Sequence, residues 1–238
     1  MREIRLIEDG SNDAFWNMAL DEALMELTPT STLRLYSWKP PAISIGYFQS
    51  LHDEVDLERC RSLGIDVIRR ITGGGAVFHD KEVTYSFIMM DYPQDVLESY
   101  KLICGAILEG LKTFGIEGEF APLNDLVLNG KKFSGNAQTR KMGRLLQHGT
   151  ILLDVDVETM FSILNVPDEK MRDKMISDVK ERVTGLDLTS DEVRQALKNG
   201  FSEVFDADLV ESEVKNDERL LAEEKAKRYA SRDWIDRI

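Results

Sequence analysis

Cysteine and histidine are scarce in this sequence, and the few that occur are scattered. Cys60 and Cys104 lie in unrelated segments without metal-ligand spacing, so we interpret both as ordinary free thiols. A three-histidine metal site would need His52, His79 and His148 from distant positions, and we discount it. The sequence therefore argues against a disulfide framework and against a histidine metal site.

Long apolar runs are also missing. No stretch of about eighteen apolar residues occurs, which argues against a membrane-spanning helix. The first residues, MREIRLIEDGSND, lack the basic, apolar and small-residue regions of a signal peptide. With only six prolines and no low-complexity tract, the composition is that of an ordinary folded chain. We therefore expect a cytoplasmic protein without a membrane partner.

Positive charge is in deficit overall, because the formal net charge is −13 at pH 7. Neutralising phosphates requires a basic face, so this balance argues against general nucleic-acid binding. Basic residues nevertheless gather at two places, at Arg69 and Arg70 and in a stretch that contains Lys131, Lys132, Arg140, Lys141 and Arg144. Such clusters suit a local anionic ligand, although we interpret Lys141 and Arg144 as solvated strand ends.

Helical and extended segments alternate along the first two thirds of the chain. One helix is expected to begin near Ser11 to Asp13, and apolar residues at steps of three and four predict a second helix between Tyr100 and Phe114. Strands are predicted at 33–38, 42–48, 65–70, 82–90 and 145–153, and the alternation in 82–90 is typical of a half-buried strand. Asn129-Gly130 predicts a two-residue hairpin.

These segments predict the α+β (α/β) fold class, with a mixed, mostly antiparallel sheet and packed helices. We expect residues 1–165 to form the core. Residues 166–238 are polar, with helices predicted at about 190–205 and 211–229. We interpret them as a helical C-terminal extension of the same domain, because a separate domain of this size is less common.

The most informative stretch is RRITGGGAVFHD, residues 69–80. Three consecutive glycines remove the side chains from a bend, so backbone N–H groups can approach a ligand closely. The adjacent arginines offer fixed positive charge to a phosphate or carboxylate. A strand follows the run instead of a helix, so neither a dinucleotide fingerprint nor a P-loop is predicted. A nucleotide site of another architecture and a plain glycine turn both remain open.

A second candidate is LNDLVLNGKKFSGNAQTR, residues 123–140. Lys131 and Lys132 are adjacent on a predicted strand and point to opposite faces, so at most one of them enters a shared site. A lysine aimed at a carboxylate and an α-phosphate can hold two reactants together and stabilise charge that develops during attack. Asn124 and Asp125 suit magnesium or a phosphate, or equally cap a turn.

The third candidate is His148, in the middle of the otherwise apolar strand LLQHGTILL. A polar ring at such a position needs a partner. That partner is either a buried hydrogen-bonding group or a ligand at a cleft. The segment by itself leaves both alternatives open.

Together these segments resemble the lipoate-protein ligase A family of the biotin and lipoate ligase superfamily. RRITGGGAVFHD is similar to the family's glycine-rich signature, NGKKFSG to its lysine motif, and LNDL and QHGTILL to the segments on either side. NMALDEAL near the start, SIGYFQ at 44–49 and YASRDWI near the end extend the resemblance over essentially the whole chain. It implies a class II synthetase-like catalytic core in residues 1–165.

The resemblance implies an ATP-dependent ligase with a two-step reaction. Lipoate and ATP give lipoyl-AMP and pyrophosphate, and a lysine of a lipoyl carrier domain, such as an E2 subunit or the glycine cleavage H protein, then attacks the adenylate. The family match selects Lys132 as the catalytic residue and implies Mg²⁺ at Asn124 and Asp125. It places ATP or lipoyl-AMP at Arg70, Gly73, Gly74, Gly75, Ala76, Val77, Phe78, His79, Asp80, Lys132, Gly135 and Ala137, and the lipoyl group at Gly46, Tyr47, His148 and Gly149.

The end of the chain departs from the family pattern. Bacterial members carry an additional small C-terminal domain, whereas this sequence ends soon after Trp234. We therefore expect a separate accessory subunit for adenylate formation. Octanoate is an alternative substrate to lipoate, whereas biotin is disfavoured because the arginine-rich glycine loop expected of biotin ligases is not seen.

The nearest alternative is an octanoyl or lipoyl transferase of the same superfamily, which carries the acyl group as a thioester on a cysteine. In related transferases that cysteine lies shortly before the strand at 125, and EFAPLND contains none. Cys104 falls in an amphipathic helix and Cys60 in a predicted surface helix, so the sequence favours the ligase. A noncatalytic lipoyl-binding protein is the second alternative.

Overall fold

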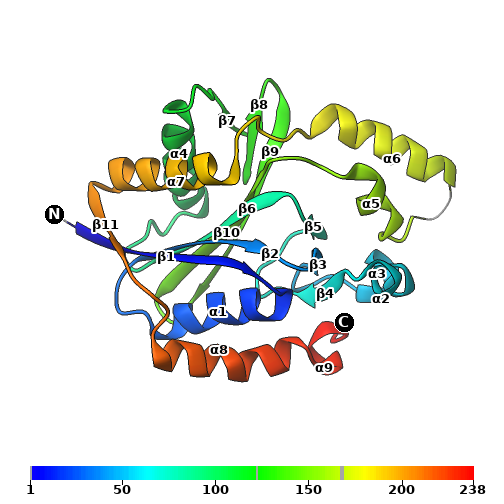
Figure 1. Cartoon of the computed structure of the whole chain (residues 1–238), viewed down its shortest axis with the longest axis horizontal. Helices are drawn as coiled ribbons and strands as arrows, with labels where there is room; N and C mark the ends of the chain where they lie inside the picture. The colour runs from blue at the N-terminus through cyan, green and yellow to red at the C-terminus, as the bar shows by residue number, and fades with distance from the viewer. Residues whose placement is uncertain (1, 122, 167–168) are drawn as a thin grey trace.

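The computed structural model describes residues 2–121, 123–166 and 169–238, which form two β-sheets flanked by helices (Figure 1). The larger sheet has eight strands in the order β11-β1-β2-β6-β10-β9-β8-β7, and the smaller has three in the order β4-β3-β5. The strands of the larger sheet are β1 (Arg2–Asn12), β2 (Thr32–Trp38), β6 (Glu82–Met89), β7 (Glu119–Ala121), β8 (Asp125–Leu128), β9 (Lys131–Lys141), β10 (Arg144–Leu152) and β11 (Ala207–Glu211). Those of the smaller sheet are β3 (Ala42–Ile45), β4 (Asp66–Arg69) and β5 (Val77–His79).

The larger sheet is mixed and mostly antiparallel, which confirms the fold class predicted from the sequence. Strand β1 runs parallel to both of its neighbours, β2 and β11. The other neighbouring strands of this sheet are antiparallel. Asn129 and Gly130 have φ of 51° and 77° and connect β8 to β9, as expected of the two-residue hairpin.

Helices cover both faces of the larger sheet (Figure 1). On one face α4 (Val96–Lys112) packs against α7 (Ser190–Phe205), and on the other α1 (Ala14–Leu27) packs against α8 (Asn216–Tyr229). A Cβ on Gly110 would lie 1.8 Å from the Ala196 carbonyl oxygen, so a glycine is required for the close approach of α4 and α7. The shorter or peripheral helices are α2 (Leu51–Glu54), α3 (Leu57–Leu63), α5 (Val157–Ser162), α6 (Glu169–Arg182) and α9 (Arg232–Ile235).

Strand β6 is buried on both faces, so the prediction of a half-buried strand was wrong. It lies in the middle of the sheet between β2 and β10. Tyr85 and Phe87 face the apolar core under α4 and α7. Thr84 and Ser86 face the opposite layer, where Thr84 accepts a hydrogen bond from Trp38 and Ser86 donates one to α1. The alternating side chains of β6 therefore face an apolar core on one side of the sheet and a buried polar layer on the other.

The C-terminal region differs in part from the helices expected there. Helix α7 matches the predicted range of 190–205, but residues 207–211 form strand β11, which pairs in parallel with β1. Helix α8 therefore begins at Asn216 instead of near residue 211. The region thus supplies an edge strand to the larger sheet as well as helices for both faces. Strand β3 is also shorter than predicted, because the chain turns after Ile45 with the Gln49 N–H bonded to the Gly46 carbonyl oxygen.

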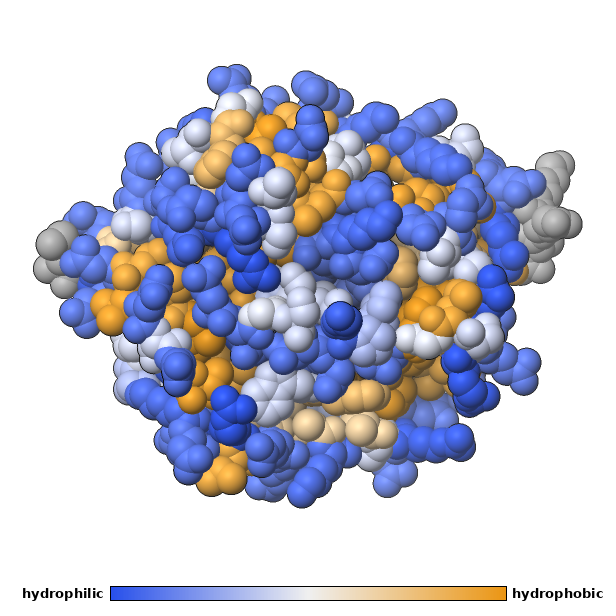
Figure 2. Space-filling view, in the orientation of Figure 1, coloured by the Kyte–Doolittle hydropathy of each residue, from blue (hydrophilic) through white to orange (hydrophobic). Residues whose placement is uncertain are grey.

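The face of the molecule drawn in Figure 2 has no single dominant apolar area. Figure 2 shows a mostly hydrophilic face on which apolar patches are separated by charged side chains. Of the helices in the described ranges, none combines the length and apolar character needed to cross a membrane.

A buried ionic cluster joins β1, β2 and α1. The Arg34 side chain on β2 is 0% exposed, and its guanidinium binds Asp21 at 2.7 Å and Asp9 at 2.6 Å. Burial opposes ionisation of Asp21, but the charge of Arg34 and the hydrogen bonds from His148 and Ser86 outweigh it. The pKa of the Asp21 carboxyl therefore lies below its ordinary value. The cluster keeps a charged carboxylate inside the protein, between α1 and the sheet.

Replacing Arg34 with methionine should lower the free energy of unfolding by about 3–5 kcal/mol, because Asp21 and Asp9 lose their shared cation. Urea unfolding followed by circular dichroism measures the change. Arg59→Met, at an exposed position of α3, is the control and should change the same quantity by less than about 0.5 kcal/mol. Equal stabilities for the two variants would contradict a supporting role for the cluster.

Candidate functional site

The glycine run forms a loop between β4 and β5, residues 72–76, which we call the glycine loop. A Cβ on Gly46 would lie 2.0 Å from the Gly74 carbonyl oxygen, so only glycine permits this approach. Gly74 has φ of 98°, which glycine adopts without strain. In the described part of the chain, the N–H groups of Gly73, Gly74 and Gly75 make no backbone hydrogen bond. Free N–H groups on a bare bend suit an anionic ligand.

Arg70 lies underneath the glycine loop and holds its backbone. The Nη2 atom donates to the carbonyl oxygens of Gly73 and Gly75 at 2.8 Å and 2.7 Å, and Nη1 donates to the Ser44 carbonyl oxygen at 3.0 Å. The residue is 5% exposed, and burial lowers the pKa of its guanidinium to about 10. Arg70 therefore shapes the loop, while its predicted contact with a nucleotide stays a prediction.

Lys132 lies on the face of the larger sheet that also carries His148. A register shift between β8 and β9 marks a bulge, which places Lys132 on the same face as Gly135 although they are three residues apart. Lys132 Nζ lies 2.8 Å from Asp125 Oδ1, and Gly135 leaves room for the end of the lysine. Because Ala137 pairs with His148, these side-chain positions share one face.

Lys131 and Lys132 have different surroundings, as expected of neighbours on a strand. Lys131 is exposed, with Nζ 3.4 Å from the Lys180 carbonyl oxygen on α6. Lys132 is only partly exposed, and its backbone carbonyl oxygen accepts a hydrogen bond from the Thr184 N–H after α6. Among the described residues, Lys132 pairs with a carboxylate at the candidate site, whereas Lys131 does not.

Asn124 and Asp125 differ in their freedom to bind a metal. The Asn124 amide donates to the Asn136 carbonyl oxygen, and the Asn136 amide donates back to the Asn124 carbonyl oxygen at 2.9 Å. Among the residues the structure describes, no group of three or more metal-ligating side chains occurs. A single partly exposed carboxylate suits a Mg²⁺ ion held mainly by substrate phosphates and water. Asp125 fits that requirement, whereas Asn124 fixes the start of β8.

Among the residues predicted for the lipoyl pocket, Gly149 and Tyr47 have different surroundings from His148. Gly149 pairs with Tyr85 and Asn136, and a Cβ there would lie 2.1 Å from Asn136 Oδ1, so its side-chain position faces away from Lys132. Close packing against Asn136 requires a glycine at this position, and its contact with a lipoyl group stays a prediction. Tyr47 lies in the turn after β3, with the Arg237 guanidinium 4.0 Å over its ring. Gly46 lies between this turn and the glycine loop.

The remaining predicted nucleotide contacts line the strand that leaves the glycine loop. Val77 and Phe78 lie on β5, where Phe78 pairs with Ile43 and Val77 with Ser44. Ala76 is partly buried at the end of the loop. Burial raises the pKa of the Asp80 carboxyl above its ordinary value. The structure thus gathers these residues along one edge of the smaller sheet, and their contact with a ligand stays a prediction.

Both histidines of the predicted site are held by buried side chains that the sequence did not identify. His148 lies between Asp21 and Thr72, and His79 lies between Glu82 and Ser44. Of the two alternatives for His148, the structure thus supplies the buried hydrogen bonds. One signal was available for Asp21, because it lies three residues after Met18, on the apolar stripe of the first predicted helix. A carboxylate on an apolar stripe requires a buried partner.

Neither cysteine has the surroundings of a nucleophile. Cys60 and Cys104 are 1% and 0% exposed. Burial raises the pKa of the Cys60 thiol to about 11 and that of the Cys104 thiol to about 12, so both are protonated near neutral pH. Cys104 belongs to the core under α4 and α7, on the face of the sheet opposite Lys132. Neither thiol can reach a substrate at the candidate site in this conformation.

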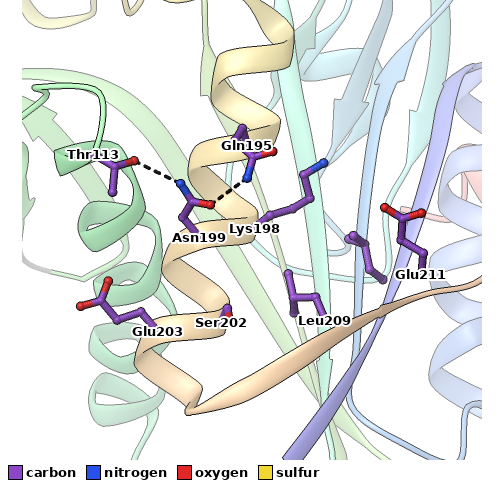
Figure 3. A pocket seen from close by; sticks show the side chains of 9 residues that line it. Thr113, Gln195, Lys198, Asn199, Ser202, Glu203, Leu209 and Glu211 are labelled. Carbon is purple, nitrogen blue, oxygen red and sulfur yellow. Dashed lines mark hydrogen bonds between the residues drawn. The ribbon is translucent and has the colours of Figure 1, made fainter.

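A separate depression of about 640 Å³ lies beside the edge strand β11 (Figure 3). It is lined by Gln195, Lys198 and Asn199 of α7 together with Leu209 and Glu211 of β11. Figure 3 shows the Gln195 and Asn199 amides bonded to each other across one turn of α7, with Asn199 also reaching Thr113. The depression contains none of the residues predicted for the site, so we do not assign it to the same function.

Comparison with known proteins identifies relatives along nearly the whole chain. The octanoyltransferase LipM of Kyrpidia tusciae is 37% identical over 98% of this chain and 98% of its own length. A chain from a bipartite lipoate protein ligase of Thermoplasma acidophilum superposes with a TM-score of 0.90 at 32% identity, covering 98% of this chain and 95% of that one. A lipoate-protein ligase A bound with ATP superposes with a TM-score of 0.87 at 29% identity, covering 99% and 98%.

The names of these relatives include both enzyme classes that the sequence suggested, the transferase and the ATP-dependent ligase. The curated relative carries the name of the transferase alternative, so the comparisons support that alternative more than the ATP-dependent ligase. The similarity to solved ligases supports the common fold and superfamily. The model of the lipoyl protein ligase A/B catalytic domain matches residues 13–202, and this protein therefore belongs to that family.

Proposed function

We propose that this protein joins a lipoyl or octanoyl group to a lysine of a lipoyl carrier domain. The family and the relatives' names support this chemistry, since the Thermoplasma ligase is described together with its E2 lipoyl domain. Lys132 is our candidate for the catalytic cation. Its side chain is partly exposed beside Asp125, on the face of the larger sheet that also carries His148. The glycine loop supplies free N–H groups for an anion.

The route that the geometry supports best begins with ATP and a free acid. The observation that carries this choice is the burial of both thiols, which leaves no accessible cysteine to form a thioester. In this route an acyl carboxylate attacks the α-phosphate of ATP, forming acyl-AMP and releasing pyrophosphate. Lys132 would lie against the carboxylate and the α-phosphate, where its charge opposes their repulsion. The carrier lysine then attacks the acyl carbon and AMP leaves.

Magnesium would act with Asp125 in this route. One carboxylate and the phosphates of ATP are a usual set of Mg²⁺ ligands, and Asp125 has side-chain exposure of 32%. The ion would reduce the negative charge on the phosphates. In the absence of Mg²⁺, the Asp125 carboxylate pairs with Lys132, and this ion pair holds both side chains in the site.

The second candidate is octanoyl transfer from an acyl thioester without ATP. The name of the curated relatives favours it directly. It requires a group other than the two buried thiols to accept the octanoyl chain, or a rearrangement that exposes one of them. A separate accessory subunit for adenylate formation is part of the first candidate, and the bipartite organisation of the Thermoplasma ligase supports it.

Lys132→Ala should reduce the rate of acyl-carrier formation by about 10²- to 10³-fold, the usual effect of removing one group that stabilises transition-state charge. The assay contains lipoate or octanoate, ATP, Mg²⁺ and a carrier domain, with a candidate accessory subunit added in parallel, and mass spectrometry follows the carrier. Lys131→Ala is the matched control and should retain close to the wild-type rate. Full activity of Lys132→Ala would instead support a noncatalytic binding role for this site.

The double variant Cys60→Ala/Cys104→Ala should keep ATP-dependent carrier acylation, and EDTA should abolish the reaction in both the variant and the wild type. A parallel assay supplies an octanoyl-carrier thioester without ATP, and intact mass spectrometry looks for octanoyl on the protein. An octanoyl adduct that the double variant loses would establish the transferase route and rule out the ligase. Circular dichroism of the variant controls for the loss of buried side chains.

A further inference from the structure

Two buried chains of hydrogen bonds support the glycine loop, one ending in the loop at Thr72 and the other ending at Ser44, which Arg70 connects to the loop. Each consists of a carboxyl group, a histidine and a hydroxyl group, in that order. The first contains Asp21, His148 and Thr72, and the second contains Glu82, His79 and Ser44. All six residues are buried. Their burial leaves little room for a substrate at the histidine nitrogens.

The first chain connects helix α1 to the start of the glycine loop. His148 Nδ1 lies 3.3 Å from Asp21 Oδ2, and His148 Nε2 lies 2.7 Å from Thr72 Oγ1. An ionised carboxylate can only accept hydrogen bonds, so Nδ1 carries a proton and donates it to Asp21, while Nε2 shares a hydrogen bond with the Thr72 hydroxyl. The Thr72 carbonyl oxygen accepts from the Tyr47 N–H at 2.9 Å. Thr72 is thus fixed by its side chain and its backbone.

The second chain connects strand β6 to the middle of the glycine loop. His79 Nδ1 lies 2.8 Å from Glu82 Oε1, and His79 Nε2 lies 2.8 Å from Ser44 Oγ. Arg70 Nη1 donates to the same Ser44 hydroxyl at 3.1 Å, while its Nη2 donates to two carbonyl oxygens of the loop. Trp38 stacks on the His79 ring at a centroid distance of 4.0 Å, which fixes the plane of the ring.

The position of Glu82 is energetically unfavourable for one of its two carboxyl oxygens. Its Oε1 accepts from both His79 and Thr84, whereas Oε2 is buried without a hydrogen-bond partner in the described part of the structure. An unpaired buried oxygen is destabilising, and such groups are concentrated where a protein fixes a functional geometry. Asp21, in contrast, is fully paired through Arg34 and Ser86.

We propose that Asp21 and Glu82 are positioning residues that hold the glycine loop in its ligand-binding shape, acting through His148–Thr72 and through His79–Ser44–Arg70. This inference rests on the proposed function for the identity of the ligand, but the effect on the loop is independent of it. The two chains fix different parts of the loop, one at Thr72 and one at the Gly73 and Gly75 carbonyl oxygens. Together they aim the free N–H groups before an anion arrives, so binding requires little reorganisation.

Nitrogen-15 NMR of the imidazole rings tests the two chains without any assay of activity. The chain has only three histidines, and the third, His52, has an exposed side chain and serves as an internal reference. Asp21→Asn should change the Nδ1 and Nε2 signals of His148 and leave those of His79 in place. Glu82→Gln should produce the reverse pattern. Unchanged histidine signals in both variants would overturn the proposal.

Ligand affinity tests the consequence for the loop. Calorimetric titration with ATP and Mg²⁺ should show binding weakened by about tenfold or more in Asp21→Asn and Glu82→Gln, because small misplacements of binding groups are costly. Thr72→Val should weaken binding similarly, and Thr72→Ser should restore it because the hydroxyl returns. Glu218→Gln is the matched control, since Glu218 is also a buried carboxylate, is paired with Arg5 and lies outside both chains. It should lose stability and keep the wild-type ATP affinity.

The outcomes separate this inference from the proposed function. If the wild-type protein does not bind ATP, the same variants are titrated with octanoate or lipoate, and a matching loss of affinity supports the two chains while it contradicts the ATP route. If Glu218→Gln weakens binding as much as Asp21→Asn, the effect is general destabilisation and the positioning role is wrong. If Thr72→Ser fails to restore the affinity lost in Thr72→Val, the first chain does not act through the hydroxyl.

Discussion

The buried Asp21 carboxylate connects the core of this protein to its candidate site. On one side it is neutralised by Arg34, which also binds Asp9 on β1. On the other side it holds His148 and thereby Thr72 at the start of the glycine loop. Removing a buried cation leaves an uncompensated charge, and here that charge also orients a histidine. The stability of the fold and the shape of the loop therefore depend on the same ionic cluster.

The parts of this architecture that depend on local sequence were predictable. Asn129-Gly130 specified a hairpin, and the period of apolar residues in 100–114 specified a helix, because both signals act over a few residues. The polar layer under α1 was not predictable, since Thr84 and Ser86 have the pattern of residues that face solvent. Strand β11 was missed for a related reason: its partner β1 lies about two hundred residues earlier in the chain.

The candidate site shows the same division between local and distant information. The sequence indicated that one of two adjacent lysines could enter the site, and strand geometry left the choice open. A bulge in β9 and the Asp125 carboxylate opposite distinguish Lys132, and neither feature can be recognised before the strands are paired. The partners of His148 and His79 come from α1, β3, β6 and the loop itself, so no single segment could reveal them.

The location of Arg70 determines how an anion can be held. From the sequence, Arg70 is a positive charge next to three glycines and so a direct ligand for phosphate. In the structure its donors bind the carbonyl oxygens of the loop and of Ser44, which turns those oxygens inward. With the carbonyl groups bound on the inner side, the loop can present its N–H groups on the other. In the proposed function, the charge that a ligand meets directly would come from Lys132, while Arg70 would contribute through the orientation of the backbone.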